Sequence, residues 1–336
     1  MKISSAVHYT LSACAAAAVL AGCSSVSQPP LSPSGATGSN LQSANGLQAF
    51  GQSGLPNRER SRSWMSPDTR GPLLYISDRG TNEVYAYSYK KKVLVGTLTG
   101  FNSPDGLCVD GSGNIFVTEF GAQDILEYAH GGTSPIATLS DAGEKPMGCS
   151  VDATTGNLAV TNFQNASRAS GNVAVYQAAS GTPTLYSDAN IYNYLYCVYD
   201  TKSNLYIDGK TYNGLDAFAE LPKNSATFTD LTLNATINYA EDIGWKNDEL
   251  IVGNTYENNQ IYWFKMKNGK GMQVGYPAAL THGYGILQFW IHGKVLIGAL
   301  PSYPNVSFWN YPAGGLPIYD IGFGGSSEPV GVAVSP

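Results

Sequence analysis

The chain has 336 residues, a formal net charge of −6 at pH 7 and 13% charged residues. A mildly acidic chain with so few charges is poorly suited to binding nucleic acid, so we expect no nucleic-acid partner.

The first residues resemble a bacterial lipoprotein signal. Met1 and Lys2 precede an apolar, alanine-rich run over residues 11–20, which continues into Leu-Ala-Gly-Cys at residues 20–23, similar to a lipobox. The run is too short to span a bilayer as a stable helix. We therefore expect residues 1–22 to be a cleaved signal peptide and Cys23 to carry the lipid that anchors the protein to a membrane of the cell envelope, outside the cytoplasm. The alternative is an ordinary secretory signal with a chance cysteine.

Residues 23–70 are rich in Ser, Gly, Pro, Gln and Asn and contain few large apolar side chains. Such a segment cannot bury enough apolar surface to fold alone, so it is predicted to be a flexible tether. Near its end we expect Trp64 and Met65 to pack against the side or base of the folded domain.

From residue 71 onward one pattern recurs. An apolar residue that begins a strand after a tight turn stands at Ile115, Leu158, Leu205, Leu250 and Val295, at spacings of 43, 47, 45 and 45 residues. A further apolar, aromatic-rich strand follows each turn region, and six copies of it begin near Val84, Ile125, Val173, Leu215, Ile261 and Val306. Short strands at this period, separated by Gly, Pro, Asn and Asp, are typical of four-stranded propeller blades.

Residues 71–336 are therefore predicted to be one all-β domain, a six-bladed β-propeller, with about 44 residues per blade. The chain end supplies a first strand, Val330–Val334, without a second strand after it, and Leu73–Ser77 reads as a second strand without a first. We expect these two to pair and close the ring, which removes exposed sheet edges.

The segment PDGLCVDGSGNIFVTEFGAQDILEY, residues 104–128, resembles an NHL-type repeat, with its Pro-x-Gly, Val-Asp and Gly-Asn elements. KPMGCSVDATTGNLAVTNF, residues 145–163, is similar, and the remaining copies keep the strand pattern. The resemblance covers about residues 71–336 and extends more loosely to six-bladed propellers of the gluconolactonase type. It implies the fold, whereas propellers host many unrelated activities.

Ligands of propellers commonly lie over the channel, on the face where loops join second to third strands and lead into first strands. These loops are rich in neutral amides and phenols, which suit polar uncharged ligands such as glycans or peptides. Ordinary turn formation explains the same composition. The candidate ligand-binding residues are Asn162, Tyr192, Tyr194, Tyr196, Asn254, Tyr256, His282 and Tyr284.

Tyr192, Tyr194 and Tyr196 alternate, which on a strand places them on one face. They predict either a stacking platform near the channel mouth or packing between blades. His282 and Tyr284 are a candidate acid/base pair. A zinc lyase site would need several histidines on this face, where the sequence offers only His282.

Four acids stand at the entrances of first strands: Asp105, Glu241, Asp242 and Glu328. Carboxylates that converge on one channel are suited to a hard cation such as Ca²⁺. Resemblance to gluconolactonase-type enzymes implies a metal held by Glu, Asp and Asn residues. Glu328 and Asp105 lie in contexts similar to that family's, but its Pro-Asn-Gly element is absent here.

Three cysteines follow the tether, Cys108, Cys149 and Cys197, each on a predicted first strand. First strands diverge around the channel, so we predict buried free thiols rather than a disulfide.

Two functions follow from these patterns. The first is an envelope-anchored lipoprotein whose propeller face binds a protein, peptide or glycan without catalysis or a required cofactor. The second is a metal-dependent hydrolase or lyase of the gluconolactonase type, with calcium as the possible metal.

Overall fold

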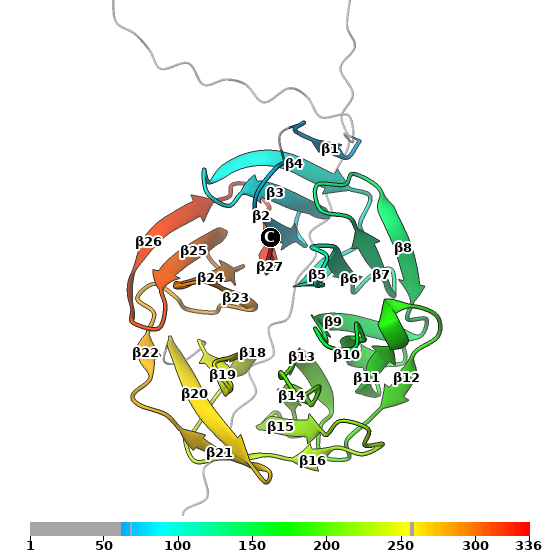
Figure 1. Cartoon of the computed structure of the whole chain (residues 1–336), viewed down its shortest axis with the longest axis vertical. Helices are drawn as coiled ribbons and strands as arrows, with labels where there is room; N and C mark the ends of the chain where they lie inside the picture. Colours follow the sequence, from blue (N-terminus) through cyan, green and yellow to red (C-terminus); the bar gives the residue numbers. More distant parts are fainter. Residues whose placement is uncertain (1–61, 68, 256–258) are drawn as a thin grey trace, which may run out of the picture. The chain divides into compact units, whose positions relative to one another are not determined.

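The computed structural model describes residues 62–67, 69–255 and 259–336. The described residues all lie in one compact unit. In that unit six antiparallel sheets are arranged around a central axis, as the sequence predicted (Figure 1). Among the described residues no helix has the length and apolar character needed to cross a membrane.

Each sheet is one blade. Its strands are given below in order from the central axis outward. The first three blades consist of the following strands: β27 (Pro329–Ser335), β2 (Leu73–Asp78), β3 (Glu83–Ser88) and β4 (Val93–Thr99) in blade 1; β5 (Pro104–Val109), β6 (Ile115–Glu119), β7 (Asp124–Tyr128) and β8 (Pro135–Ser140) in blade 2; β9 (Glu144–Val151), β10 (Leu158–Asn165), β11 (Ser170–Tyr176) and β12 (Thr184–Tyr186) in blade 3, where a 3-10 turn, η1 (Gln177–Ala179), follows β11.

The other three blades have the same order. Their strands are β13 (Asn193–Tyr199), β14 (Leu205–Lys210), β15 (Asp216–Leu221) and β16 (Thr229–Asp230) in blade 4; β18 (Ala240–Lys246), β19 (Glu249–Asn254), β20 (Gln260–Lys267) and β21 (Lys270–Gln273) in blade 5; β23 (Phe289–His292), β24 (Val295–Leu300), β25 (Asn305–Asn310) and β26 (Gly314–Gly322) in blade 6. Two short strands extend blade 5, namely β17 (Thr232–Leu233) beside β21 and β22 (Ala278–Ala279) beside β20.

The predicted ring closure is confirmed. The C-terminal strand β27 pairs antiparallel with β2, from Leu73 opposite Ser335 to Ser77 opposite Gly331. Blade 1 is thus built from both ends of the described domain.

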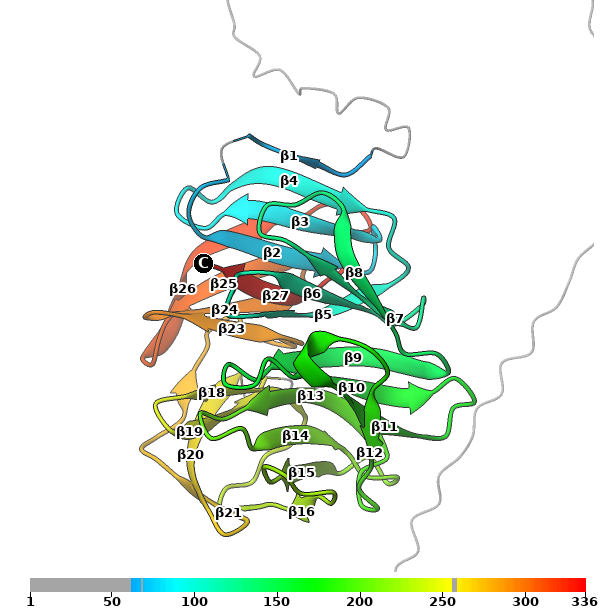
Figure 2. The same cartoon turned by 45° about the vertical axis from the view of Figure 1, so that its right-hand side comes forward.

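We call the face with the loops that join second to third strands, and each blade to the next, the upper face. The face with the hairpin turns is the lower face. Because β27 runs downward, the C-terminus lies on the lower face, at the left of the ring in Figure 2.

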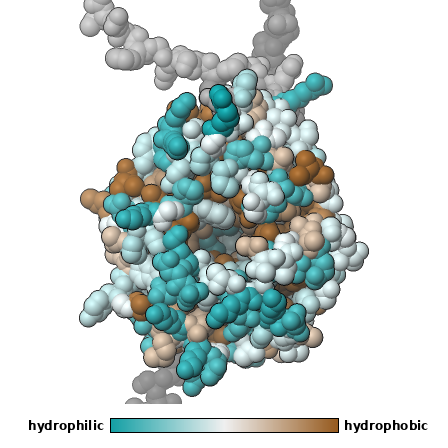
Figure 3. Space-filling model, viewed as in Figure 1, coloured by the Kyte–Doolittle hydropathy of each residue, from teal (hydrophilic) through white to brown (hydrophobic). Residues whose placement is uncertain are grey.

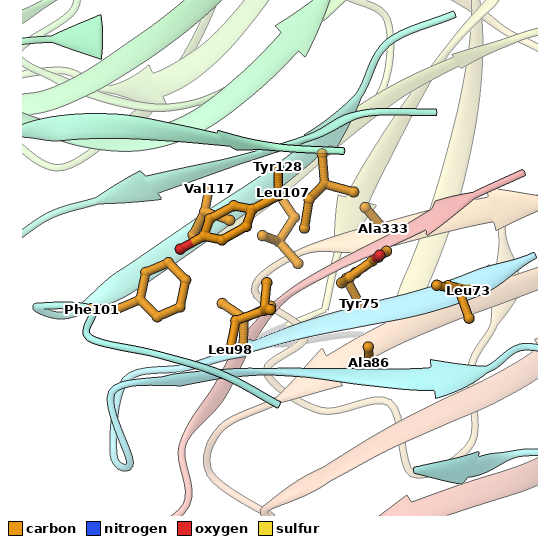
Figure 4. Packing of buried hydrophobic residues seen from close by; sticks show 11 residues of the cluster. Leu73, Tyr75, Ala86, Leu98, Phe101, Leu107, Val117, Tyr128 and Ala333 are labelled. Carbon is orange, nitrogen blue, oxygen red and sulfur yellow. The ribbon is translucent and has the colours of Figure 1, made fainter. Parts of the chain in front are cut away.

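A strand inside a blade is covered on both sides, which explains why its sequence is continuously apolar. In β2 all six residues are buried. Leu73 and Tyr75 pack toward blade 2, whereas Leu74 and Ile76 pack toward blade 6, as the period of two residues requires. Figure 4 shows the first of these clusters, in which Leu98 and Ala333 of blade 1 meet Leu107 and Val117 of blade 2.

The end of the predicted tether contributes to blade 1. Trp64–Met65 forms β1, which pairs antiparallel with the outer strand β4, with Trp64 opposite Thr97 and Met65 opposite Gly96. Gly96 has no side chain, which leaves room for the thioether of Met65. The expectation that Trp64 and Met65 lie against the side of the propeller is confirmed, and β1 covers an otherwise open edge.

The prediction of three free thiols is wrong. Cys108 on β5 and Cys149 on β9 form a disulfide between blades 2 and 3, with Cα atoms 5.7 Å apart, and Cys197 is a buried free thiol. First strands approach more closely than expected because Gly106 of β5 lies against the main chain of Met147, where a Cβ atom would collide.

Replacing Cys108 and Cys149 together by serine is expected to lower the free energy of unfolding by about 2–4 kcal/mol, since the bridge restricts the unfolded chain. Thermal melting of the double variant measures this loss. Cys197→Ser is the matched control, because it removes a buried thiol without removing a cross-link. If the double variant melts no lower than this control, the bridge does not contribute to stability.

Candidate functional site

The upper end of the channel is occupied by side chains from several first strands. The pairings of β5, β9, β13 and β18 with their second strands each contain an irregularity near the upper end. Such bulges re-aim the side chains beside them. Met147, Leu195 and Tyr196 pack together there, with Phe163 against them. We call these three side chains the plug.

Below this plug the channel is hollow. A cavity of about 230 Å³ is lined by the lower parts of five first strands. Its lining residues include Asp242, Trp245 and Gln288. Figure 3 shows the hollow at the centre of the ring. The amide of Gln288 ties three blades together, since its oxygen accepts hydrogen bonds from the N–H groups of Leu107 and Val332.

A buried ion pair stands at the plug. The guanidinium of Arg79, from the loop after β2, bonds to Oδ2 of Asp105, whose side chain is fully buried. Burial raises the pKa of Asp105, and the charge of Arg79 opposes that rise. Oδ1 of Asp105 and Nε of Arg79 are buried without a hydrogen-bond partner.

Tyr196 lies within the electrostatic reach of this pair. Its hydroxyl is buried and has no hydrogen-bond partner. Burial raises its pKa far above the usual range, and the carboxylates of Asp105 and Asp242 raise it further. Burial likewise raises the pKa of Glu241 to about 7, against the opposing charge of Lys210.

Of the four predicted metal-binding acids, Asp105 and Asp242 are buried below the upper rim, and both are bonded to protein partners. Asp105 is bonded to Arg79, and both oxygens of Asp242 accept main-chain hydrogen bonds, from Ile243 and Phe289. Glu328 is exposed at the rim. Among the described residues no three His, Cys, Asp or Glu side chains are arranged to hold a metal. Calcium binding at these acids stays a prediction.

Neighbouring blades are linked around the plug by hydroxyl side chains at equivalent positions of second strands. The sequence patterns did not reveal this role. Thr118 on β6 and Thr161 on β10 donate hydrogen bonds to the carbonyls of Met147 and Leu195, each in the next blade, and Ser77 on β2 does the same to Asp105. The equivalent residue of blade 4 is Asp208, which accepts a bond from the N–H of Tyr196. Its Oδ2 is buried and unpaired.

Asp208 makes the stability of the ring dependent on pH. Burial raises its pKa to about 8, compared with about 3.9 in an unfolded chain. The stability that protonated Asp208 contributes is therefore fully present below about pH 4 and is lost as the pH rises to about 8. At about pH 9 the free energy of unfolding of Asp208→Asn should exceed that of the wild type by on the order of 2 kcal/mol. At about pH 4 the two should be nearly equal.

Melting curves over this pH range, with Asp230→Asn as an exposed control, measure the effect. The same difference in melting between Asp208→Asn and the wild type at both ends of the pH range would contradict this prediction.

Exposed aromatic side chains lie in several loops of the upper face. Tyr212 is 81% exposed and Tyr303 57%, and both come from loops between second and third strands. Tyr212 makes an edge contact with Tyr192 at 5.2 Å between ring centroids, and Tyr303 makes one with Tyr284 at 6.5 Å. Tyr239 is 48% exposed, with the ammonium of Lys210 at 5.2 Å from its ring.

Tyr192 and Tyr212 also border an open groove between blades 3 and 4. The groove has a volume of about 660 Å³ and is lined by amides, hydroxyls and one carboxylate, including Asn172, Asp188 and Asn190. The hydroxyl of Tyr192 donates a hydrogen bond to the carbonyl of Arg168, so the ring is held in place.

The three alternating tyrosines do not share one exposed face. Tyr194 is buried between blades 3 and 4, with its hydroxyl bonded to the main chain of Asp188, and Tyr196 is buried at the plug. The irregularity between Tyr194 and Cys197 breaks the strand alternation on which the platform depended. Only Tyr192 lies on the upper surface, where its neighbour Tyr212 is more exposed.

The other predicted ligand residues are scattered. Asn162 is buried and donates a hydrogen bond to Asn172, and Asn254 is buried without a partner for either amide atom. His282 and Tyr284 are exposed in the loop before β23. Tyr256 and Cys23 lie outside the described residues.

Comparison with known proteins agrees on the class of fold, a six-bladed β-propeller. No family model matches the sequence, and no curated protein matches it. A chain from the crystal structure of a nidogen/laminin complex is 12% identical with a TM-score of 0.65, over 79% of this chain and 99% of that one.

Two further structures are similar. A protein of unknown function from Bacteroides caccae is 9% identical with a TM-score of 0.57, over 79% of this chain and 99% of that one. A chain of the mitotic checkpoint complex is 15% identical with a TM-score of 0.54, over 74% and 73%. At these identities the similarity shows the fold alone.

Proposed function

We propose that this protein is a lipoprotein of the cell envelope, anchored through Cys23, whose NHL-like propeller binds a protein, peptide or glycan on its upper face without catalysing a reaction. The observation that carries the proposal is the set of exposed tyrosines in the loops of the upper face, Tyr212, Tyr239, Tyr284 and Tyr303. Tyrosine supplies a large contact area with a polar end at low entropic cost, which is why it is common in binding surfaces.

Three further observations support it. The plug of Met147, Leu195 and Tyr196 fills the upper channel, so a ligand would rest across the mouth rather than enter it. The nidogen/laminin and mitotic checkpoint structures are protein complexes that contain propellers of this shape. The Cys108–Cys149 disulfide suits an oxidising location outside the cytoplasm.

The test is capture of ligands from solubilised native envelope on immobilised protein. Wild type is compared with Tyr212→Ala/Tyr303→Ala on the upper face and with the control Tyr319→Ala. Tyr319 is 44% exposed and lies on β26, the outer strand of blade 6. Ligand retained by wild type and control and lost by the upper-face variant supports the proposal. Equal retention by all three overturns it.

A further inference from the structure

The lower face carries a concentration of positive charge over blades 5, 6 and 1. Eight lysines lie there, with the carboxylates of Asp248 and Glu249 among them and those of Asp200 and Glu220, from blade 4, bordering the same groove as Lys265 and Lys267. They are located in the hairpin turns and at the lower ends of strands: Lys90, Lys91, Lys92, Lys246, Lys265, Lys267, Lys270 and Lys294. We call this set the basic arc. It is unexpected in a chain whose net charge is −6.

The charges of the arc are accessible and reinforce one another. Six of its lysines are exposed, and Lys92 and Lys246 are half-buried. Lys92 lies over the ring of Tyr89, at 3.8 Å from the centroid, which holds its stem at the surface. The pKa of His292 is lowered, first by burial and then by the charges of Lys246 and Lys92.

Exposed apolar side chains lie beside the lysines on the same rim. Val93 and Leu94 follow the turn that contains Lys92, and they are 49% and 37% exposed. Met272 follows Lys270 on β21 and is 56% exposed, and Leu316 near the lower end of β26 is 66% exposed. Lysines interspersed with exposed apolar side chains are typical of surfaces that rest on a bilayer.

The upper face has the opposite sign. Glu241 and Glu328 line its rim, with Asp105 and Asp242 buried just below, and two of its cations, Arg79 and Lys210, are paired with Asp105 and Asp216. The two faces of the ring therefore carry charge of opposite sign. Near an anionic surface such a molecule turns its lower face toward the surface.

We propose that the basic arc docks on the surface of an anionic lipid bilayer, so that the upper face is presented away from the membrane. The proposal deepens the proposed function and rests on it only for the presence of a membrane nearby. Each lysine held close to an anionic bilayer strengthens binding by about fivefold. The apolar rim favours a bilayer over nucleic acid, because these side chains can enter the boundary between headgroups and acyl chains.

The test uses the mature chain from Ser24, which carries no acyl group, and vesicles of phosphatidylcholine with or without phosphatidylglycerol. We expect binding to the anionic vesicles, and loss of most of it when salt is raised from about 0.1 M to about 1 M, where the screening length falls from about 10 Å to about 3 Å. The arc variant Lys90→Glu/Lys267→Glu/Lys294→Glu should bind at least about 100-fold more weakly.

The matched control is Arg62→Glu/Lys145→Glu/Arg168→Glu, which makes the same change in charge at the upper ends of the blades and should stay within about fivefold of the wild type. Both variants must have the same melting temperature as the wild type. Leu94→Ser/Leu316→Ser should also weaken binding, by about tenfold, because apolar contacts add to the electrostatic attraction.

Equal binding to both kinds of vesicle, or equal loss in the arc and control variants, overturns the proposal. So does tighter binding to duplex DNA or polyglutamate than to vesicles, or displacement by inorganic phosphate, since the arc would then serve a different anion. Because this assay contains neither the lipid anchor nor an envelope ligand, its failure is distinguishable from failure of binding at the upper face.

Discussion

Deletion of residues 328–336 is expected to abolish the cooperative unfolding transition of the propeller. Every residue of β27 is buried. Val332 and Val334 belong to the cluster between blades 6 and 1, and Ala333 to the cluster between blades 1 and 2. Burial of each valine contributes about 1.5–3 kcal/mol. Loss of the strand therefore removes two interfaces at once, an amount comparable with the whole stability of a domain, about 5–15 kcal/mol.

Circular dichroism melting of the truncated chain measures this result. Deletion of the exposed Pro336 alone is the control and should melt with the full chain. A truncated chain that keeps the full-length melting temperature would show that the ring does not depend on closure through β27.

Arg79→Met is expected to lower the free energy of unfolding by about 3–5 kcal/mol at pH 7, because it leaves the buried carboxylate of Asp105 without its counter-ion. The loss should be smaller at about pH 4. Burial already raises the pKa of Asp105, and removal of Arg79 raises it further. A raised carboxyl pKa gives stability that is present at low pH and is lost as the pH rises.

Denaturant unfolding at both pH values tests this prediction. The double variant Arg79→Met/Asp105→Leu removes both charges and should recover most of the loss, as replacement of a buried pair by apolar residues often does. An equal loss at both pH values, or no recovery in the double variant, would mean that the ion pair is not the source of the effect.

The repeat and the ring closure could be predicted from the sequence because they depend on strand periodicity. The runs that begin at Ile115, Leu158, Leu205 and Val295 are the starts of second strands. The same periodicity failed for Tyr194 and Tyr196, since one irregularity in β13 reverses which way the following side chains point. Bulges at the ends of strands have no strong local signature, so side-chain direction was least predictable where the candidate site lies.

The disulfide and the ion pair depend on distances between blades, which periodicity does not give. Cys108 and Cys149 meet because Gly106 allows two first strands to approach. Arg79 follows a second strand in a loop that carries no recognisable motif, and only the fold places it against Asp105. The basic arc likewise joins turns that are distant in sequence, so its net charge is visible only on the folded ring.

We propose that the ligand binds on the upper face of the ring. Hydroxyl-radical labelling of tyrosines, followed by mass spectrometry, tests it without knowledge of the ligand. The protein is labelled in native envelope and again after purification. We expect Tyr212 and Tyr303, both exposed in the isolated ring, to be protected in the envelope, whereas Tyr319 on the outer strand β26 is labelled equally in both. Protection of Tyr319 with unchanged labelling of Tyr212 and Tyr303 would show that another surface binds.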